Sequence, residues 1–386
     1  MCNTNFSDSI RYIGCDDKTI DLFESQYVVP NGVSYNSYLI LDDKIAIMDT
    51  VDRRATEEWL DKLEQALAGR TPDYLVVQHL EPDHSASIQA VCEKYPALQI
   101  VTSAKSAAML PQFFTMDFTG RVTAVKEGDT LSLGSHTLTF VMAPMVHWPE
   151  VMVSYESSEK VLFAADGFGK FGALDTDEDW DCEARRYYFN IVGKYGGPVQ
   201  TLLKKAAALD IQTICPLHGP ILTEDLGHYI GKYQIWSSYQ PENEGVTIVC
   251  ASIHGNTLQA AKKLQEILEA RGVKVSLFDL SRDDKAEAVE DAFRYDKLVL
   301  AAASYDGGVF LPMENFLCAL TAKAYQNRKV ALVENGSWAP CAARVMKGYL
   351  EKMKKIDLCP TTVTIKSTLK DADVAKLEQL ADELLG

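Results

Sequence analysis

The first 240 residues alternate short apolar runs with polar turns, a pattern that predicts β structure with intervening helices. Trp59, Leu63 and Leu67 recur at helical spacing, so we expect a helix with one apolar face there. The predicted strands cover 20–23, 34–41, 44–49, 74–77, 100–102, 151–155, 161–165 and 213–215, with a further β region at 122–144. The predicted helices cover 54–68, 85–95, 104–110 and 198–208, and the stretch 173–190 fits neither pattern. This order favours an αββα sandwich over a Rossmann sheet.

Beyond residue 245 the pattern changes to a strict alternation of apolar runs and amphipathic stretches. The polar sequence PENEG at 241–245 predicts a linker between two domains, 1–240 and 246–386. The predicted strands after it cover 246–252, 273–280, 297–304, 329–334 and 362–365, and the predicted helices cover 257–271, 284–294, 312–325, 341–354 and 370–385. Strands joined by helices in this way predict a doubly wound five-stranded parallel sheet.

Composition and charge then exclude several classes of protein. A hydrophobic content of 47% with 24% charged residues is typical of a globular protein. No stretch reaches the ~20 apolar residues of a membrane helix, and the N-terminus lacks the basic start and apolar core of a signal peptide. The net charge of −16 disfavours nucleic acid and anionic membranes as partners. We therefore expect a cytoplasmic protein.

The cysteines show no metal-binding or disulfide spacing. There are nine of them, scattered along the chain and without a C-x-x-C pair. We expect reduced, mostly buried thiols in a reducing compartment. The spacing also excludes a fused rubredoxin-type or zinc-ribbon module.

The sequence QHLEPDHS, at 78–85, directly follows the predicted strand 74–77 and is rich in metal-capable side chains. Because side chains alternate along a strand, His79, Glu81 and Asp83 are expected to share one face, with His84 beside them. Two imidazoles and two carboxylates this close would repel or stay unsatisfied unless a cation held them. A metal site is thus favoured over a merely solvated polar loop.

Three more metal-capable residues follow predicted strands. His147 lies in APMVHWPE, Asp166 follows 161–165, and His218 lies in CPLHGP. Singly, each would more often be a structural residue. Together with the 78–85 motif, they predict further ligands at strand ends, whereas His136 and His228 are expected to be structural or surface residues.

In the second half, three loops at the carboxyl ends of predicted parallel strands are rich in hydroxyls, glycines and aromatic residues. Parallel strands of this kind bind ligands at these ends. Hydroxyls and backbone N–H groups at a helix start suit a phosphate, aromatic residues can flank a flavin ring, and glycines allow backbone N–H groups to approach it. The candidate residues are Ser252, His254, Gly255, Asn256 and Thr257 in the first loop, Ser304, Tyr305, Asp306, Gly307 and Gly308 in the second, and Asn335, Gly336, Ser337 and Trp338 in the third. Without a nucleoside-binding fingerprint, FMN is preferred to FAD.

Together these motifs resemble those of the flavodiiron proteins (A-type flavoproteins) over essentially the whole chain. The resemblance includes H-x-E-x-D-H at 79–84, SYNSYLI at 34–40 and HGPI at 218–221. The first loop of the second half is similar to the flavodoxin pattern T/S-x-x-G-N/S-T. The resemblance implies a metallo-β-lactamase-like αββα domain followed by a flavodoxin-like FMN domain.

The resemblance also implies a ligand set for two non-haem irons. His79, Glu81 and His147 would hold one iron, Asp83, His84 and His218 the other, and Asp166 would bridge them. Hydrolytic relatives of the fold use H-x-H-x-D-H for zinc, and Glu81 stands where their second histidine would be. A carboxylate in place of an imidazole makes the site harder, which favours Fe(III).

The activity implied is the reduction of dioxygen to water, of nitric oxide to nitrous oxide, or of both. Two ferrous irons and one reduced flavin hold the four electrons that dioxygen needs, while nitric oxide reduction needs two. The family brings the flavin of one subunit beside the irons of another, so a head-to-tail homodimer, or a dimer of dimers, is expected. Lacking its own C-x-x-C module, the chain would need a separate donor such as rubredoxin or a reduced deazaflavin.

Two other functions stay open at the level of sequence. One is a dinuclear metallohydrolase fused to a flavodoxin-like module, against which Glu81 and the flavin loops argue. The other is a flavin electron carrier with a vestigial metal site, against which the full set of ligands argues.

Overall fold

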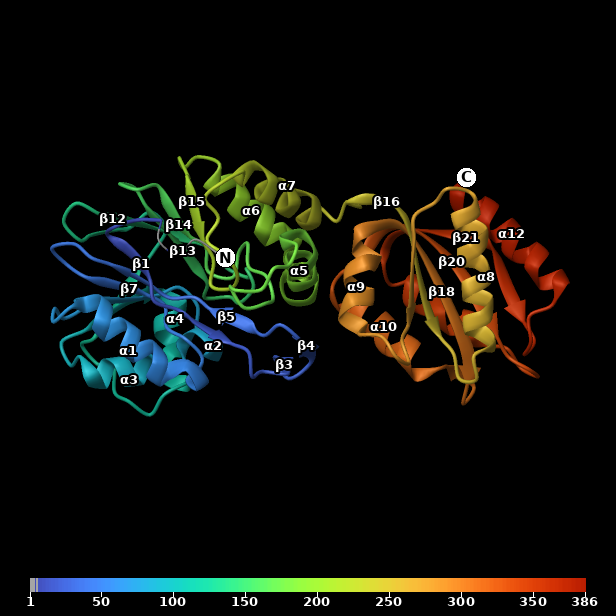
Figure 1. The fold of residues 1–386 in the computed structure, drawn as a ribbon, viewed down its shortest axis with the longest axis horizontal. Helices are drawn as coiled ribbons and strands as arrows, with labels where there is room; N and C mark the ends of the chain where they lie inside the picture. The colour runs from blue at the N-terminus through green and yellow to red at the C-terminus, as the bar shows by residue number, and fades with distance from the viewer. Residues whose placement is uncertain (1–3, 5) are drawn as a thin grey trace. The chain divides into compact units, whose positions relative to one another are not determined.

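The computed structural model describes residue 4 and residues 6–386, which form two units (Figure 1). The N-terminal unit comprises Met1–Tyr188 and Gly197–Gln234, and the C-terminal unit comprises Phe189–Gly196 and Ile235–Gly386. The domain boundaries drawn from the sequence, at 240 and 246, stay a prediction.

Two sheets form the centre of the N-terminal unit. The first has the order β1-β6-β7-β8-β9-β10, antiparallel through β7 and parallel from β7 to β10, and the second has the order β11-β12-β13-β14-β15. The strands of the first are β1 (Ile10–Tyr12), β6 (Tyr38–Ile40), β7 (Ala46–Met48), β8 (Tyr74–Val77), β9 (Gln99–Ser103) and β10 (Val122–Val125). Those of the second are β11 (Thr130–Ser132), β12 (Thr137–Met142), β13 (Met152–Glu156), β14 (Val161–Phe163) and β15 (Thr213–Cys215). Two small ribbons pair β2 (Cys15–Asp17) with β5 (Val33–Tyr35) and β3 (Leu22–Phe23) with β4 (Tyr27–Val28).

The core of this unit lies between the two sheets. Tyr38 and Val76 from the first sheet belong to the same buried cluster as Phe140, Met152 and Phe163 from the second. Figure 1 shows α1 and α3 on one side of the sheets and α6 and α7 on the other, which confirms the αββα sandwich. The helices of this unit are η1 (Arg53–Ala55), α1 (Thr56–Leu67), α2 (Pro82–Ser85), α3 (Ile88–Lys94), α4 (Ala104–Met109), η2 (Leu110–Gln112), α5 (Trp180–Tyr187), α6 (Gly196–Ala206) and α7 (Leu226–Ser237). Two short turns between α5 and α6, η3 (Tyr188–Val192) and η4 (Gly193–Tyr195), fall in the segment Phe189–Gly196 that belongs to the C-terminal unit.

The C-terminal unit contains the predicted five-stranded parallel sheet, in the order β17-β16-β18-β20-β21. Helices α8 and α12 pack on one face of it and α9, α10 and α11 on the other (Figure 1). The strands are β16 (Asn243–Ala251), β17 (Val275–Asp279), β18 (Tyr295–Tyr305), β20 (Gln326–Asn335) and β21 (Lys354–Ile365), and a short β19 (Gly308–Val309) pairs antiparallel with β18. The helices are α8 (Asn256–Ala270), α9 (Lys285–Arg294), α10 (Leu311–Ala322), α11 (Ala342–Leu350) and α12 (Asp371–Leu385).

Three element boundaries in this unit differ clearly from the prediction. The expected linker 241–245 is shorter, because β16 already begins at Asn243. The helix expected to end at residue 354 ends at Leu350, and β21 begins at Lys354 rather than near 362. β21 is an edge strand whose pairing with β20 shifts register. Its first half carries lysines and an aspartate, and Pro360 lies within it, so its sequence lacks the usual apolar signal of a strand.

The cysteines follow the expectation of reduced thiols as far as the structure describes them. Cys15, Cys92, Cys250 and Cys359 are buried free thiols, and Cys318 is an exposed one. Cys2 lies outside the described residues. In the described part of the chain, no helix is long and apolar enough to cross a membrane.

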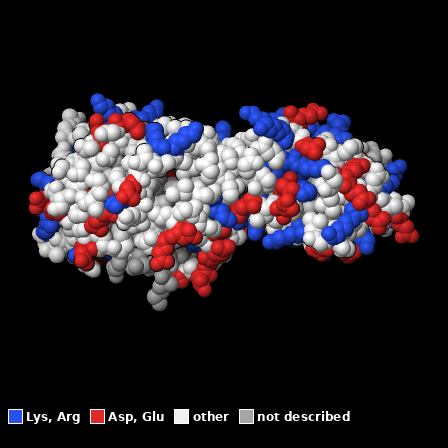
Figure 2. Space-filling view, turned by 90° about the horizontal axis from the view of Figure 1, so that it is seen from above, with Lys and Arg blue, Asp and Glu red and all other residues white. Residues whose placement is uncertain are grey.

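Charged side chains are mixed on the surface. Figure 2 shows one face of the molecule, where Lys and Arg side chains lie among Asp and Glu side chains. With a net charge of −16, this mixed distribution gives no support on that face to the binding of a polyanion.

A buried histidine ties the start of the chain to the second sheet. His136 pairs through Nδ1 with Asp42, at 2.7 Å, and through Nε2 with Glu159, at 3.2 Å. Glu159 also accepts hydrogen bonds from Ser7 and Ser9. Burial alone would lower the pKa of His136, but its bonds with Asp42 and Glu159 raise the pKa above the usual value. His136 is therefore structural, as expected from the sequence.

We predict that His136→Gln destabilises the protein more at low pH than at high pH. Because the pKa of His136 is raised on folding, its contribution is complete below the unfolded value of about 6.5 and is lost as the pH rises through the folded value. Losing the charged hydrogen bonds should cost about 1–2 kcal/mol near pH 6 and clearly less near pH 9. Urea unfolding of the N-terminal unit at both pH values measures this. His228→Gln, at a histidine that is 39% exposed and paired with Asp181, is the matched control and should change stability little. An equal loss at both pH values would contradict the prediction.

Candidate functional site

The chain turns sharply after β8, and a buried carboxylate holds this turn. Asp49, itself at φ 53°, accepts hydrogen bonds from the backbone N–H of Gln78, at 2.7 Å, and from its side-chain amide, at 2.9 Å. Pro82 then opens the short helix α2, where a missing N–H has no cost. Ser85 closes the turn by donating to the carbonyl of Leu80. His79 and Glu81 therefore precede α2, and Asp83 and His84 lie on it.

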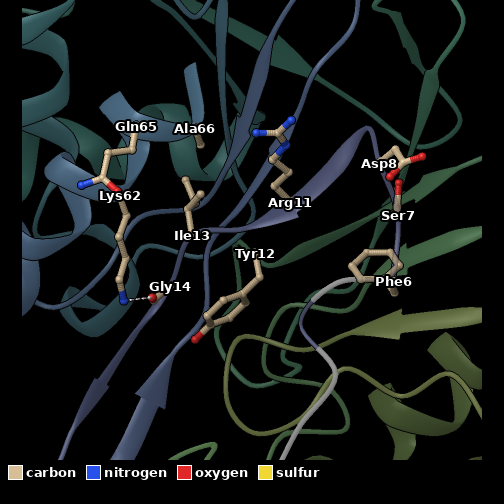
Figure 3. Close-up of a pocket in the computed structure, with 10 residues that line it drawn as sticks. All are labelled: Phe6, Ser7, Asp8, Arg11, Tyr12, Ile13, Gly14, Lys62, Gln65 and Ala66. Atoms are coloured by element: carbon tan, nitrogen blue, oxygen red, sulfur yellow. Dashed lines mark hydrogen bonds between the residues drawn. The ribbon is translucent and has the colours of Figure 1, made fainter. Parts of the chain in front are cut away.

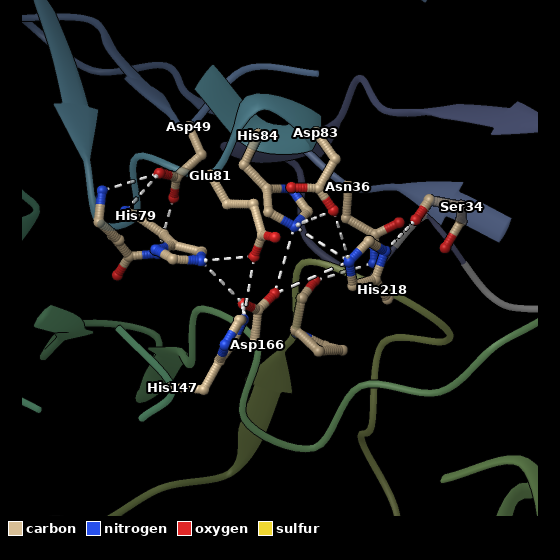
Figure 4. A network of polar contacts seen from close by, with 12 residues as sticks. Ser34, Asn36, Asp49, His79, Glu81, Asp83, His84, His147, Asp166 and His218 are labelled. Carbon is tan, nitrogen blue, oxygen red and sulfur yellow. Dashed lines mark hydrogen bonds and ion pairs between the residues drawn. The ribbon is translucent and has the colours of Figure 1, made fainter. Parts of the chain in front are cut away.

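The first group of metal-capable side chains consists of His79, Glu81, His147 and Asp166. One ligand atom of each lies within 4.8 Å of the others. His79 Nε2 lies 3.2 Å from both Glu81 Oε2 and Asp166 Oδ2. His147 Nε2 lies 3.0 Å and 3.1 Å from the same two oxygens. Two imidazoles and two carboxylates thus face one point (Figure 4).

The second group consists of Asp83, His84 and His218, again with ligand atoms within 4.8 Å of one another. His84 Nε2 lies 3.3 Å and His218 Nε2 3.2 Å from Asp83 Oδ2. Asp166 joins the two groups, since its Oδ1 lies 3.2 Å from His84 Nε2 and its Oδ2 faces the first group (Figure 4). One carboxylate therefore lies between two clusters of ligand atoms.

The charges and orphaned atoms of these groups fit bound cations. The distance between His84 Nε2 and His218 Nε2 is 3.0 Å. Two imidazole nitrogens this close repel each other unless a proton or a cation lies between them. Asp83 Oδ1 is buried and has no hydrogen-bond partner among the residues that the structure describes, and the buried Asp166 Oδ1 has only its ion-pair contacts with His84 and His218. Burial would lower the pKa of His147, but Asp166 and Glu81 raise it to about 9. A cation could replace the proton that these carboxylates hold on the imidazole.

The nitrogens that face away from this centre are partly fixed by hydrogen bonds. His79 Nδ1 lies 2.8 Å from Glu150 Oε1, and His218 Nδ1 donates to the carbonyl of Ser34 at 2.7 Å. These bonds set the tautomer that leaves each Nε2 as an acceptor toward the centre. Glu150 and Asp49 were missed in the sequence, because no motif or spacing distinguishes a buried carboxylate that bonds a histidine or its neighbour from behind. Ser34 opens the SYNSYLI motif, but its carbonyl was not predicted to bond His218.

The structure brings all seven predicted metal-ligand residues together, and their role as ligands stays a prediction. The expectation that Asp83 shares a face with His79 and Glu81 is wrong. The strand ends before Pro82, and α2 turns Asp83 into the second group with His84 and His218. Nothing in the sequence marks so short a helix except Pro82 itself.

A small cavity leads to this centre. Its volume is about 260 Å³, and Glu81 and Asp83 line it together with Phe23, Glu24 and Arg54. Phe23 also packs edge-on against His218, with ring centroids 5.3 Å apart. The turn between β3 and β4 thus lies beside the centre and narrows the access to it.

The three predicted loops of the C-terminal unit line one cavity of about 530 Å³. Of the fourteen predicted residues, all but Gly255 and Gly308 line it. Gly255, at φ 88°, caps the start of α8, and Gly308 pairs with Tyr305 between β18 and β19. Five lining residues were not predicted, namely Ile253, Ala303, Ala339, Cys341 and Ser367.

Local hydrogen bonds fix these loops. Ser252 Oγ accepts from Gly255 N at 3.1 Å, and Ser304 Oγ accepts from Cys341 N at 2.8 Å. Asn335 exchanges hydrogen bonds with the backbone of Ser367, which follows β21. Ser367 could have been found from its place after the fifth strand, by the same rule that gave the other loops. The strand predicted at 362–365 ends two residues before Ser367.

The second loop is a tight hairpin between β18 and β19. Asp306 and Gly307 have φ angles of 48° and 72°. Both lie in the left-handed region, as a two-residue type I′ hairpin turn requires. The side chain of Tyr305 is 45% exposed and that of Trp338 92% exposed. Two aromatic rings beside the cavity are thus open to stack on a flat ligand.

A further cavity of about 750 Å³ lies in the N-terminal unit between the start of the chain and α1 (Figure 3). Asp8, Arg11 and Lys62 are its charged lining residues, and Lys62 Nζ donates to the carbonyl of Gly14 at 2.8 Å. Two cationic side chains and one carboxylate do not form a set of metal ligands. Of the cavities described, those beside Glu81 and Asp83 and beside Trp338 therefore carry the candidate chemistry.

Comparisons with known proteins agree with both units. A family model described as "ODP family beta lactamase" matches residues 33–219. A nitric oxide reductase of Moorella thermoacetica is 30% identical, over 91% of this chain and 90% of that protein. The solved rubredoxin oxygen:oxidoreductase of Desulfovibrio gigas is 27% identical with a TM-score of 0.92, covering 99% of this chain and 97% of that one. A variant of the flavo di-iron protein of Thermotoga maritima, 24% identical with a TM-score of 0.90 over 100% and 98% of the two chains, has the same fold.

We predict that the full chain binds two equivalents of a divalent metal such as Zn²⁺. His218→Ala should reduce this to one, because it removes a ligand of the second group only. Asp166→Asn should weaken both equivalents, because Asp166 faces both groups. Metal analysis after dialysis against a weak chelator measures the stoichiometry.

His136→Gln is the matched control for these variants, since it replaces a buried histidine away from both groups, and it should keep two equivalents. A wild-type chain that keeps no metal, or a His218→Ala chain that keeps both equivalents, would show that the groups are not the two metal positions.

Proposed function

The chain belongs to the flavodiiron protein family of oxidoreductases, and we propose that it reduces dioxygen to water, nitric oxide to nitrous oxide, or both. The observation that carries the proposal is the convergence of two buried groups of ligand atoms on one shared carboxylate, Asp166. A chain with such a centre and with a flavin-sized cavity in its other unit has the two parts that this chemistry needs.

His79, Glu81 and His147 would hold one non-haem iron, Asp83, His84 and His218 the other, and Asp166 would bridge them. Four imidazoles and three carboxylates are a mixed nitrogen and oxygen set that suits iron and leaves room for a substrate. All seven come from strand ends or the adjoining α2, so the sheets hold them rigidly. The buried atoms Asp83 Oδ1 and Asp166 Oδ1 support a cation at each position.

FMN would occupy the cavity of the C-terminal unit. Ser252 and the start of α8 support the phosphate, since a helix N-terminus offers unpaired N–H groups to an anion. Tyr305 and Trp338 support the flavin ring by stacking. The cavity volume of about 530 Å³ lies within the range of small-ligand sites.

When bound, the iron pair and FMN supply the electrons for the reduction. The chain's own residues set what reaches the centre. The wall of the small access cavity combines apolar side chains, Ile20, Leu22 and Phe23, with charged ones such as Glu24, Asp52 and Arg54. Glu24 is exposed to solvent but lines the same cavity, where partial desolvation and the charge of Glu81 raise the pKa of its carboxyl to about 7. Glu24 can thus hold a proton on its carboxyl near neutral pH, and both reductions consume protons.

The assembly and the electron donor belong to the same proposal. We propose a head-to-tail homodimer, or a dimer of dimers, in which the FMN of one subunit serves the irons of its partner. A separate donor such as rubredoxin or a reduced deazaflavin would deliver the electrons. The name of the Desulfovibrio gigas relative, which pairs rubredoxin with oxygen, supports a donor of the first kind.

Metallohydrolase and electron-carrier activities are the competing proposals. Zinc hydrolysis needs an activated water but no redox partner. Glu81, which makes the ligand set harder, and the flavin-sized cavity both favour the redox reaction. The completeness of the two ligand groups argues against a carrier with a vestigial metal site.

The gas reaction can be tested by loading the full chain with iron and FMN, reducing it anaerobically, and timing its reoxidation by dioxygen and by nitric oxide separately. We expect at least one gas to reoxidise the wild-type chain far faster than it reoxidises free FMN. His218→Ala, loaded with FMN in the same way, should lose this fast phase because one iron position is missing. A wild-type rate no faster than that of free flavin with both gases would contradict the proposal.

We also predict that Trp338→Ala weakens FMN binding by about fivefold, or about 1 kcal/mol, through the loss of ring stacking. Quenching of FMN fluorescence during titration with flavin-free protein measures the dissociation constant. Leu311→Ala is the control, since Leu311 is 58% exposed in the same unit and does not line the cavity. An unchanged affinity in Trp338→Ala would remove Trp338 from the flavin site.

A further inference from the structure

The two groups of ligand atoms match in type but differ in what supports them from behind. Apart from the shared Asp166, each group has two imidazoles and one carboxylate. Groups outside the ligands can therefore make the two metal positions differ. The hydrogen bonds of the outward-facing Nδ1 atoms supply one such difference.

In the first group, a carboxylate supports His79. Glu150 Oε1 lies 2.8 Å from His79 Nδ1, and both side chains are fully buried. The same oxygen accepts from the backbone N–H of Leu80 at 3.0 Å, which fixes the carboxylate in place. Glu150 Oε2 is buried and has no hydrogen-bond partner in the described part of the structure. Glu150 therefore interacts mainly with His79 and with the N–H of Leu80.

Glu150 Oε1 lies within hydrogen-bond distance of two donors, His79 Nδ1 at 2.8 Å and the Leu80 N–H at 3.0 Å. A buried carboxylate with so few partners interacts strongly with the imidazole it touches, because the surrounding dielectric is low.

In the second group, no carboxylate plays this role for the histidines. His218 Nδ1 donates to the backbone carbonyl of Ser34, a neutral acceptor, at 2.7 Å. His84 Nδ1 is buried and lacks a hydrogen-bond partner among the described residues. Neither outward-facing Nδ1 is hydrogen-bonded to a carboxylate, and the buried Asp49 interacts electrostatically with a histidine of each group, His84 and His79.

We propose that Glu150 is a positioning residue that makes the two metal positions unequal. By accepting from His79 Nδ1, it makes Nε2 a stronger donor and adds negative charge near the first position. The position of His79, Glu81 and His147 therefore binds a divalent metal more tightly than that of Asp83, His84 and His218. With iron bound, as the proposed function requires, the first position also favours the ferric state more strongly.

The test compares the two positions separately in the full chain. His218→Ala leaves the first position intact and His147→Ala leaves the second, and Zn²⁺ affinity is measured by competition with a chelator. We expect the first position to be the tighter one. Adding Glu150→Gln, which keeps the shape and removes the charge, should weaken the first position about 10- to 100-fold and the second by less than about threefold.

Glu156→Gln is the matched control. Glu156 is also a fully buried glutamate of the N-terminal unit, and it accepts from the backbone of Ser158 and Glu159, away from both groups. It should leave both affinities unchanged. Equal weakening of the two positions by Glu150→Gln, or no weakening of the first, would overturn the proposal.

Two further readouts keep the proposal testable if Glu150→Gln folds poorly. The first is the comparison of Zn²⁺ affinity between His218→Ala and His147→Ala, which needs no change at Glu150. If the second position binds Zn²⁺ as tightly as the first, the inference is contradicted. The second is the reduction potential of each iron in the iron-loaded chain. The milder variant Glu150→Asp should raise this potential at one iron only. If the wild-type chain binds no metal at all, the proposed function fails as well. If it binds two metals of equal affinity, this inference alone fails.

Discussion

The gathering of six ionisable side chains around the buried carboxylate of Asp166 is the constraint on which the rest of the N-terminal unit depends. Asp166, 1% exposed, lies within ion-pair distance of four histidines. Removing so much charge from water costs several kcal/mol per unpaired ion, and cations at the two positions offset that cost. The sandwich supplies the rigid frame, because its apolar core holds the strand ends from which these side chains project. Metal binding and the stability of this region should therefore be coupled.

The same frame explains why the centre can be both closed and reactive. The β3–β4 turn packs Phe23 against His218 and leaves only a small cavity beside Glu81 and Asp83. Charged as well as apolar side chains line this cavity, which is the route by which a small substrate would reach Glu81 and Asp83. Behind the ligands, Asp49 holds the backbone and Glu150 supports His79, so contacts outside the ligand set fix the backbone at Gln78 and the ring of His79. Function in this unit thus rests on polar groups that the core forces into fixed places.

A structural feature could be predicted from the sequence where its signal lies in neighbouring residues of the chain. Strand 74–77 and the ligand residues after it could be predicted, because an apolar run bounded by polar residues is a local signal. The parallel sheet of the C-terminal unit followed from its regular alternation, and twelve of the fourteen flavin-loop residues do line one cavity. Helix α2 was missed because four residues carry no periodicity, and the start of β21 because an edge strand with lysines lacks an apolar pattern. Glu150 and Asp49 were missed because their partners are set by tertiary packing, many residues away in sequence.

The central claim is that the two groups of ligand atoms hold two irons bridged by Asp166. Anomalous diffraction from crystals of the full chain, recorded on both sides of the iron absorption edge, tests it most directly. The account predicts two iron peaks, one among His79, Glu81 and His147 and the other among Asp83, His84 and His218, with Asp166 in contact with both. A single peak, peaks that appear only at the zinc edge, or no peak in protein prepared with iron would contradict it.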